Sequence, residues 1–424
     1  MIEYIKNLPQ EIQDLIKFAG NLADSNNVSA YLVGGFVRDL ILGVNNLDLD
    51  IVVENDGIKF AEFLSESLNA KLTRHRRFGT ATVLVKPHLK LDVATARKEF
   101  YPHPAHLPVV SGGSLKDDLF RRDFTINAMA IGLNSGNFGQ LIDYFGGQVD
   151  LKNMKLRVLH DLSFIDDPTR ILRAIRFETR HDFKIEPHTF KLLKSAVRLK
   201  MLNKVEPQRL RDDLVLILKE RKPIKEIKRL KVLAGFNFIS QHLEVTLKTL
   251  KLFASVEKEI AWFKKIHLKK RQLEDWLIYL MALLDSLDAK KVGYFCRRFA
   301  FKKGEEKRIL SEKNIDARFV SKLKQKDFKP SEIFKLLDPL SYEAIILLKA
   351  KHRNRLTKKR IEDFFEIYNE MKICVSGKDL HALGVAPGPF YKKIFTKVLN
   401  AKLNGVVKTR EEELELIKNS IKAQ

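Results

Sequence analysis

Two aspartates, Asp48 and Asp50, have side chains and a spacing that could do chemistry. They lie in LDLDIVVE (residues 47–54), whose apolar residues predict a β-strand. Side chains two positions apart in a strand point to the same face, so the two carboxylates would repel each other unless a cation lay between them. Magnesium takes oxygen ligands from one or two carboxylates and from substrate phosphates. The pair therefore predicts a two-metal site for an in-line displacement at phosphorus. The alternative is that the two carboxylates are solvated charges at the edge of a sheet, which is the common case for an isolated pair of this kind.

A pair of glycines, Gly34 and Gly35, precedes the aspartates and predicts a phosphate-binding turn. The glycines follow a predicted strand over residues 28–33 and open a predicted helix. Glycine lets the backbone approach a phosphate closely, and the N-terminus of a helix favours negative charge. Arg38, one turn into the helix, would reach the same phosphates. This turn and the apolar strand around Asp50 favour the functional interpretation of the aspartate pair.

A third acid, Asp92, is the one carboxylate in the predicted strand LKLDVAT (residues 89–95). It is a candidate for positioning the hydroxyl that attacks phosphorus, or for accepting the proton of that hydroxyl. The alternative is an ordinary solvent-facing aspartate.

The segment DDLFRRDFTINA (residues 117–128) places two adjacent arginines among acids and apolar residues. Arginines are costly to bury without carboxylate partners. We expect Asp118 and Asp123 to orient the arginines, so that Arg122 faces a triphosphate and Asn127 hydrogen-bonds a sugar. A surface ion-pair network is the alternative, but it explains the apolar neighbours less well.

The segment DDPTRILRAIRF (residues 166–177) predicts a helix with a stripe of positive charge. Pro168 suits the first turn of a helix. Arg170, Arg173 and Arg176 recur every three residues, on one slowly drifting face. Three cations in a row require a polyanion or several carboxylates beside them.

Asp167 lies one turn before this stripe, so Asp167 and Arg170 can share a helix face. Cytosine and adenine both present an exocyclic amine beside a ring-nitrogen acceptor. A carboxylate accepts a hydrogen bond from the amine and a guanidinium donates one to the ring nitrogen, whereas guanine and uracil present the opposite pattern. We therefore hypothesise that this pair selects C and A without a nucleic-acid template.

The composition favours a nucleic-acid partner. Among 424 residues, 77 Lys and Arg stand against 53 Asp and Glu, which gives a net charge of +24. Such a surplus attracts polyanions, although a basic surface kept for solubility or heat tolerance is the alternative. The two cysteines, Cys296 and Cys374, exclude a disulfide framework or a cysteine-rich zinc site. Without a signal-peptide pattern or an apolar run long enough for a membrane span, we expect a cytoplasmic protein with no membrane association and no obligate protein partner.

Strand and helix patterns alternate up to about residue 150, which predicts an α+β fold. Further expected elements are a helix over residues 58–68, a strand over 81–86, and a loop rich in proline and glycine over 102–113. Beyond about residue 150 the strand signal stops and the pattern is helical, with Lys and Arg on most polar faces.

Five segments together resemble the class II tRNA nucleotidyltransferase and bacterial poly(A) polymerase family. They are LVGGFVRD, DLDIVV, DLFRRDFTINAMA, DYFGGQVDL and DDPTRILRAIRF, and they cover residues 28–180 densely. The resemblance implies a mixed-sheet, DNA-polymerase-beta-like head followed by all-helical domains. It also implies magnesium-dependent addition of C and A to the tRNA 3′ end from CTP and ATP. The expected domains are a catalytic head (1–150), a neck for base recognition (151–215), an RNA-binding body (216–368) and a tRNA-binding tail (369–424).

In family terms, Asp48 and Asp50 match the metal ligands. The nucleotide contacts are matched by Gly35, Arg38, Arg122 and the helix residues Asp167, Arg170, Arg173 and Arg176. Two departures are visible. Asp166 stands where the family commonly has Glu, which affects only a flanking acid, and Tyr144 stands in the hinge segment where Pro is common.

The stretch between Asp92 and Asp117 resembles the flexible loop of enzymes that add the terminal A, and enzymes that add only CC tend to have it shortened or altered. Full CCA addition or A addition is therefore favoured over CC addition. The alternatives are a poly(A) polymerase and a non-catalytic RNA-binding protein that reuses the fold. A Gly/Pro turn near the C-terminus resembles the tail of longer members, and such a turn can bind RNA phosphate. The RNA-backbone candidates are Arg297, Arg298, Arg353, Arg355, Lys358, Lys359 and Gly388.

Overall fold

The computed structural model describes residues 2–44, 46–87, 89–266 and 272–422. The chain forms two compact units. Unit 1 comprises Met1–Ile217 with Lys225–Phe238, and unit 2 comprises Leu218–Ile224 with Ile239–Gln424. The finer division into head, neck, body and tail stays a prediction.

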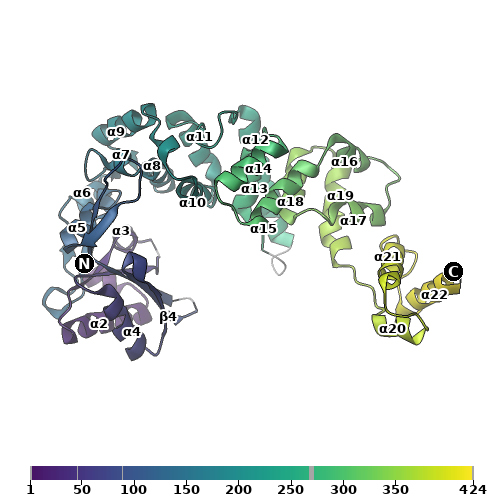
Figure 1. Ribbon diagram of the computed structural model, residues 1–424, viewed down its shortest axis with the longest axis horizontal. Coiled ribbons are helices and arrows are strands. Elements are labelled where there is room, and N and C mark those ends of the chain that lie inside the picture. The colour runs from purple at the N-terminus through teal and green to yellow at the C-terminus, as the bar shows by residue number, and fades with distance from the viewer. Residues whose placement is uncertain (1, 45, 88, 267–271, 423–424) are drawn as a thin grey trace. The chain divides into compact units, whose positions relative to one another are not determined.

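Seven strands of the described chain form one mixed sheet in unit 1 (Figure 1). β2 and β5 run parallel and the other neighbouring strands run antiparallel. The sheet beside helices, followed by a largely helical remainder, confirms the expected α+β fold. In spatial order the strands are β3 (Lys71–His75), β4 (Thr80–Lys86), β5 (Leu89–Thr95), β2 (Leu49–Val53), β1 (Ala30–Val33), β8 (Ala130–Gly132) and β9 (Leu141–Ile142).

The central strand β2 is apolar apart from Asp50, as expected for a strand inside the sheet. Ile51, Val52 and Val53 of β2 are all buried. Two helices, α2 (Gln10–Ser25) and α4 (Gly57–Ser67), pack against each other, and α4 also packs against β4 and β5 (Figure 1). Burial of these apolar faces is the main stabilising term for such a domain.

Three local features differ from the sequence expectation. Asp48 lies just before β2 rather than within it, so only Asp50 of the aspartate pair is a strand residue. The expected loop contains β7 (Val109–Gly112), which forms a hairpin with β6 (Arg97–Phe100) just before the loop, and the prolines between the two strands oppose a strand prediction. The strand signal does not stop at residue 150, because β10 (Lys155–Leu156) pairs with β11 (Lys184–Ile185).

Helices of unit 1 follow and flank the sheet. The charged segment 166–177 forms most of a helix, α8, as expected, with Pro168 immediately before it. One face of α8 is buried through Ile171, Leu172 and Ile175. Besides α2 and α4, the α-helices of unit 1 are α1 (Ile2–Lys6), α3 (Gly35–Leu42), α5 (Leu115–Phe120), α6 (Gly147–Lys152), α7 (Ser163–Asp166), α8 (Thr169–Arg180), α9 (Pro187–Arg198), α10 (Pro207–Leu218) and α11 (Pro223–Leu233), and the last two each include one or two residues of unit 2.

The described residues of unit 2 contain helices and no strands (Figure 1). An aromatic cluster of Phe263, Tyr342 and Phe365 forms part of its core. No described helix combines the length and the apolar character needed to cross a membrane. The helices are α12 (Leu247–Ile266), α13 (Asp275–Leu283), α14 (Ala289–Arg298), α15 (Lys303–Ser311), α16 (Ala317–Lys322), α17 (Pro330–Leu337), α18 (Tyr342–Lys351), α19 (Arg355–Glu366), α20 (Gly377–Ala382), α21 (Pro389–Leu403) and α22 (Arg410–Lys422).

Gly20 of α2 sets how closely this helix approaches the end of β8. A Cβ at this position would overlap the backbone carbonyl of Leu133. Because backbone cannot move aside as a flexible side chain can, we expect Gly20→Ala to lower the free energy of unfolding by about 2 kcal/mol, measured by urea denaturation. Gly136→Ala is the matched control, since a Cβ there meets no atom within 4 Å. Equal stability of Gly20→Ala and the wild type would contradict this close packing.

Candidate active site

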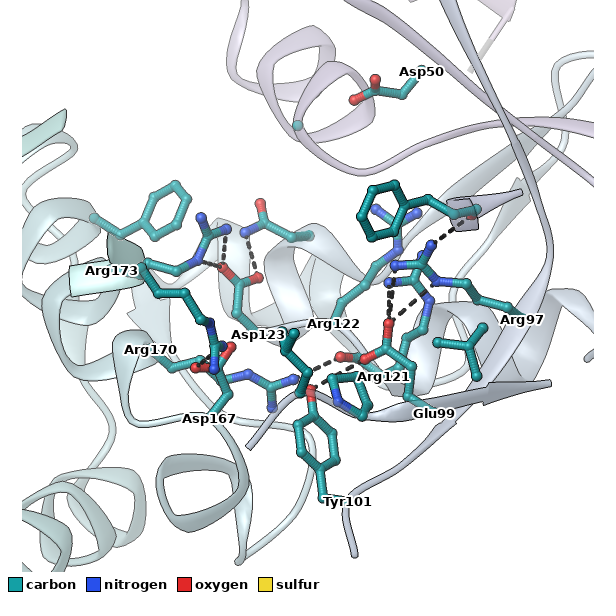
Figure 2. A pocket seen from close by; sticks show the side chains of 18 of the residues that line it. Asp50, Arg97, Glu99, Tyr101, Arg121, Arg122, Asp123, Asp167, Arg170 and Arg173 are labelled. Atoms are coloured by element: carbon teal, nitrogen blue, oxygen red, sulfur yellow. Dashed lines mark hydrogen bonds and ion pairs between the residues drawn. The ribbon is translucent and has the colours of Figure 1, made fainter. Parts of the chain in front are cut away.

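A cavity of about 760 Å³ in unit 1 brings together most of the candidate residues (Figure 2). Eight arginines and four carboxylates line it, so the cavity carries a surplus of positive charge that suits a polyanion. The arginines are Arg38, Arg77, Arg97, Arg121, Arg122, Arg170, Arg173 and Arg209, and the carboxylates are Asp50, Glu99, Asp123 and Asp167. Gly35 and Asn127 also line the cavity, whereas Gly34, Asp48, Asp92 and Arg176 do not.

The missing side chain of Gly34 leaves room for an arginine beside the N-terminus of a helix. Gly34 precedes α3 with a φ of 72°, a conformation that favours glycine. A Cβ on Gly34 would lie 2.5 Å from Nη1 of Arg122. The guanidinium expected to face a triphosphate therefore lies beside the N-terminus of α3, where both groups attract anions.

A buried chain of polar contacts joins α3 to α8. Arg38 donates from Nη1 to Asn127 Oδ1 at 2.6 Å and from Nε to Asp39 Oδ1 at 2.8 Å. Asn127 Nδ2 in turn donates to Asp123 Oδ1 at 2.9 Å. Asp123 Oδ2 accepts from Nε and Nη2 of Arg173 at 2.8 and 2.5 Å. This series of hydrogen bonds orients two cavity arginines, Arg38 at one end and Arg173 at the other.

Asp118, and not Asp123, orients the two adjacent arginines. Its Oδ1 accepts from Arg121 and its Oδ2 from Arg122, at 2.7 and 2.8 Å. Burial alone would raise the pKa of Asp118, but the charges of Arg122 and Arg121 and their hydrogen bonds hold this pKa below its usual value. The expectation that Asp123 shares this task was wrong, because its partner is Arg173, fifty positions later in the chain.

Asp123 is strongly stabilised as a carboxylate. Burial alone would raise its pKa, but the charge of Arg173 and the hydrogen bonds from Asn127 and Arg173 lower the pKa to about 2. The ion pair therefore stays formed at any physiological pH.

Two of the three acids named from the sequence pair with a lysine, and the third lies beside one of them in the sheet. Asp50 and Asp92 are partners in the register of β2 and β5. Lys90 Nζ lies 2.7 Å from Asp92 Oδ2 and 3.6 Å from Asp48 Oδ1. Thr82 Oγ1 donates to the other oxygen of Asp92 at 2.6 Å. The Asp48 side chain is 69% exposed, so it lies at the open edge of this group.

Asp50 is the acid of this group that lines the cavity. Burial raises its pKa to about 6, Arg122 opposes the shift, and the charges of Asp92 and Asp48 add to it. Figure 2 shows Asp50 set apart from the cluster of arginines. A cation beside Asp50 would relieve both the burial and the repulsion.

The chemistry of this acid group fits a magnesium ion. Its donors are carboxylate oxygens, the ligands that Mg²⁺ prefers, and an ammonium group already lies against two of them. The described residues contain no cluster of three or more His, Cys, Asp or Glu side chains that could hold a metal ion. The expected ligands, Asp48 and Asp50, are a pair.

The predicted pair of Asp167 and Arg170 lies in the cavity, but the two side chains are held by different partners. Arg170 is buried and donates from Nη1 to Ser163 Oγ and from Nη2 to the carbonyl of Arg121, both at 2.7 Å. Asp167 accepts from Arg209 Nη2 at 2.7 Å. Of the expected arginine stripe, Arg170 and Arg173 face the cavity, while Arg176 lies over the ring of Phe177.

The sequence reasoning missed a second carboxylate hub in the cavity. Glu99 Oε1 accepts from Arg97 at 3.0 Å and from Arg121 at 3.1 Å, and its Oε2 accepts from the Tyr101 hydroxyl at 3.1 Å (Figure 2). Arg97, Glu99 and Tyr101 alternate along β6 and its end, which is a period-2 signal for one strand face. The missed Arg209 has no comparable signal, because its partner Asp167 is 42 positions away.

The expected RNA-backbone residues all lie in unit 2, and their role stays a prediction. Lys358 is paired with Glu259 at 2.5 Å and Lys359 with Asp363 at 2.9 Å. Arg297, whose side chain is exposed, pairs with Glu306 at 3.4 Å. The remaining candidates, Arg298, Arg353, Arg355 and Gly388, are exposed.

Comparisons with known proteins agree with these features. Residues 30–157 match the model of the poly A polymerase head domain. The chain is 39% identical over 97% of its length to an A-adding tRNA nucleotidyltransferase of Geobacter sulfurreducens, of which it spans 47%. It spans 41% of a second A-adding tRNA nucleotidyltransferase, from Aquifex aeolicus, at 36% identity over 81% of its own length. The chain thus spans about half the length of these relatives.

Other relatives match from end to end. An A-adding tRNA nucleotidyltransferase of Halalkalibacterium halodurans is 30% identical over 95% of this chain and 91% of the relative. The solved Thermotoga maritima CCA-adding enzyme in complex with tRNA_CCA has a TM-score of 0.73 and 33% identity, covering 99% of this chain and 98% of that one. Solved complexes of a CCA-adding enzyme with CTP and with ATP have a TM-score of 0.75 and 33% identity, and cover at least 98% of this chain and 97% of each structure's chain.

The Asp123–Arg173 pair predicts a pH-dependent contribution to stability. Because the folded-state pKa of about 2 lies below the ordinary 3.8, the carboxylate stabilises the fold above about pH 4, and this contribution is lost as the pH falls toward 2. At pH 7 we expect Asp123→Asn to lower the free energy of unfolding by about 2–3 kcal/mol, measured by urea denaturation.

The difference between Asp123→Asn and the wild type should shrink between pH 4 and pH 2. Asp161→Asn, at an exposed pair with His188, is the control and should leave stability unchanged. A difference that is absent at pH 7, or that stays constant down to pH 2, would contradict the assigned ion pair.

Proposed function

Because the chain belongs to the family of A-adding and CCA-adding tRNA nucleotidyltransferases, we propose that it adds nucleotides to the 3′ end of tRNA and releases pyrophosphate. The observation that carries the proposal is one cavity that joins a carboxylate on a central strand to a surplus of arginines. A nucleoside triphosphate requires both features, since its phosphates need positive charge and its reacting phosphorus needs a site for a metal ion.

The triphosphate lies along Arg38 of α3, Arg122, which follows α5, and Arg173 of α8. Arg122, beside the N-terminus of α3, and Arg173, oriented by Asp123, contact its phosphate oxygens. Arg38, which also lines the cavity, reaches the same phosphates, and Asn127, which accepts a hydrogen bond from Arg38, faces the sugar. Because these side chains are already held by buried partners, binding requires little reorganisation, which is how positioning and charge stabilisation lower a barrier.

In the chemical step, the 3′-hydroxyl oxygen of the tRNA attacks the α-phosphorus of the nucleotide. The new oxygen–phosphorus bond forms as the bond to the bridging oxygen breaks, and pyrophosphate leaves. Asp92, beside Asp50 in the sheet, positions the hydroxyl and accepts its proton. Asp48 and Asp50 hold magnesium, which when bound neutralises charge on the phosphate oxygens.

Asp167 and Arg170 select the base. Asp167 accepts a hydrogen bond from the exocyclic amine of adenine or cytosine, and Arg170 donates to the neighbouring ring nitrogen. The two described hydrogen bonds of Arg170 leave further N–H groups for the base and hold its guanidinium at the cavity wall. Guanine and uracil would place a carbonyl against the carboxylate of Asp167, which is repulsive.

The substrates that we propose are CTP and ATP, used in turn to complete the CCA end. The residues 94–99 that resemble the loop of A-adding and CCA-adding enzymes are present and form the end of β5 and most of β6. A specific observation favours a second candidate, the addition of the terminal A alone, because the relatives at 39% and 36% identity are named A-adding. The tRNA itself binds the basic helices of unit 2, through the exposed candidates Arg297, Arg298, Arg353 and Arg355 and through Gly388.

An addition assay separates the two candidates. The protein is incubated with magnesium, one labelled nucleotide at a time, and tRNA lacking CCA, lacking CA or lacking only the terminal A. We expect C to be added to the first two tRNAs and A to the third. Addition of A without any addition of C would establish the A-adding candidate, and no addition to any tRNA would contradict the proposed function.

Asp48→Ala tests the catalytic acids within the same assay. We expect this substitution to lower incorporation by at least about 100-fold, because the phosphate charge would no longer be neutralised. Binding of tRNA, measured by filter retention, should stay close to that of the wild type. Asp161→Ala, an exposed acid distant in sequence, serves as the control. Retained activity of Asp48→Ala would refute its role as a metal ligand.

Asp167→Ala tests base selection. Without its carboxylate the cavity no longer repels the carbonyl groups of guanine and uracil, so incorporation of GTP and UTP should rise relative to ATP and CTP. We expect the preference to fall by about tenfold or more, measured as ratios of kcat/KM. An equal loss for all four nucleotides would exclude this role and indicate a general effect on triphosphate binding.

A further inference from the structure

Arg209 lines the cavity but has no role in the mechanism proposed above. It lies on α10 and pairs with Asp167 at 2.7 Å, with about a fifth of each side chain exposed. Its position on the helix is fixed by Leu210, Leu214 and Ile217, which are completely buried. A cation held this firmly against the base-selecting carboxylate affects what that carboxylate can do.

The two carboxylate oxygens of Asp167 differ in their hydrogen bonds. Oδ1 accepts from Arg209 Nη2 at 2.7 Å, from Thr169 Oγ1 at 2.8 Å and from the Thr169 backbone N–H at 3.1 Å. Within the described part of the chain, no hydrogen bond to Oδ2 is found. Three donors on one oxygen fix the plane and direction of the carboxylate, so that Oδ2 is the acceptor left for the amine of a base.

Arg209 also contacts the loop that contains Ala105. Its Nη1 donates to the carbonyl of Ala105 at 3.5 Å. The N–H of Ala105 donates to the carbonyls of Ile165 and Asp166, at 3.1 and 3.2 Å, at the C-terminal end of α7. Arg209 therefore contacts both the carboxylate of Asp167 and a loop that is bonded to the two preceding residues.

From this arrangement we propose that Arg209 is a positioning residue for base selection. It holds Oδ1 of Asp167, and thereby aims Oδ2 at the exocyclic amine of adenine or cytosine. The inference rests on the proposed function, because it assigns the base contact to Asp167. Arg209 acts through Asp167 and does not contact the reacting atoms.

Arg209→Gln tests the inference through a ratio of rates. The variant removes the charge of the guanidinium and its ability to donate to Asp167 and Ala105 at once, while keeping a polar side chain. The measured quantity is kcat/KM for ATP divided by kcat/KM for GTP, with a tRNA that lacks only the terminal A. We expect this ratio to fall by about tenfold, because a charged hydrogen bond that orients Asp167 is lost. A purely structural role would lower both rates together and leave the ratio unchanged.

Two further variants make the result specific. Arg209→Lys keeps the charge but cannot donate from two nitrogens in a fixed plane, so its ratio should lie between those of the wild type and Arg209→Gln. Arg211→Gln removes the same charge two positions along α10, where Arg211 pairs with Asp212, and should keep the wild-type ratio. If Arg209→Gln does not fold, as judged by its thermal melting, the comparison of Arg209→Lys with the wild type decides the outcome.

The outcomes separate the inference from the proposed function. An unchanged ATP to GTP ratio in folded Arg209→Gln or Arg209→Lys would overturn the inference while leaving the function in place. If the wild-type protein adds no nucleotide to any tRNA, the proposed function fails, and calorimetric titration with ATP and with GTP still measures selectivity. A wild-type preference for ATP that falls in Arg209→Gln would support the inference in that case, and equal ratios would overturn it.

Discussion

The repulsion among eight arginines that line one cavity is the constraint on which the site depends. Guanidinium groups stay charged at any accessible pH, so this repulsion must be balanced by carboxylates. Asp118, Asp123 and Glu99 each accept from at least one of these arginines. Each of these acids is buried or nearly so, and their charges are not screened by water as surface charges are. The cavity is therefore cationic and ordered before any anion enters it.

These carboxylates also determine which faces of the arginines remain for a ligand. Asp118 accepts hydrogen bonds from one edge of Arg121 and of Arg122, and Asp123 accepts them from Nε and Nη2 of Arg173. A planar guanidinium with one edge bonded presents its other N–H groups in a fixed direction. The same contacts that make burial of the arginines tolerable thus give the site its geometry, and removal of an acid would affect stability and binding together.

Motifs that are local in the sequence could be predicted, and contacts between distant segments could not. β5 spans the residues that its alternation predicts, and the sheet with helices confirms the fold class expected from the chain. Gly35, Asp50, Arg122 and Asp167, which the local motifs named, all line one cavity. The partner of Asp123 was assigned wrongly, because a carboxylate beside two arginines in the sequence can instead reach a helix fifty positions later. The hairpin of β6 and β7 escaped prediction, since each strand has only four residues and three prolines lie between them.

Helix α8 connects selection of the base to binding of the triphosphate. Asp167 lies in extended backbone two positions before its first residue, and Arg173 lies on its second turn. Both side chains are held by partners outside α8, Asp167 by Arg209 of α10 and Arg173 by Asp123. A base that bonds poorly to Asp167 cannot be accommodated by sliding the nucleotide along the helix, because its phosphates would then leave Arg173. Two anchored side chains, one just before α8 and one on it, therefore convert a mismatch at the base into misplacement of the reacting phosphorus, which lowers the rate as well as the affinity.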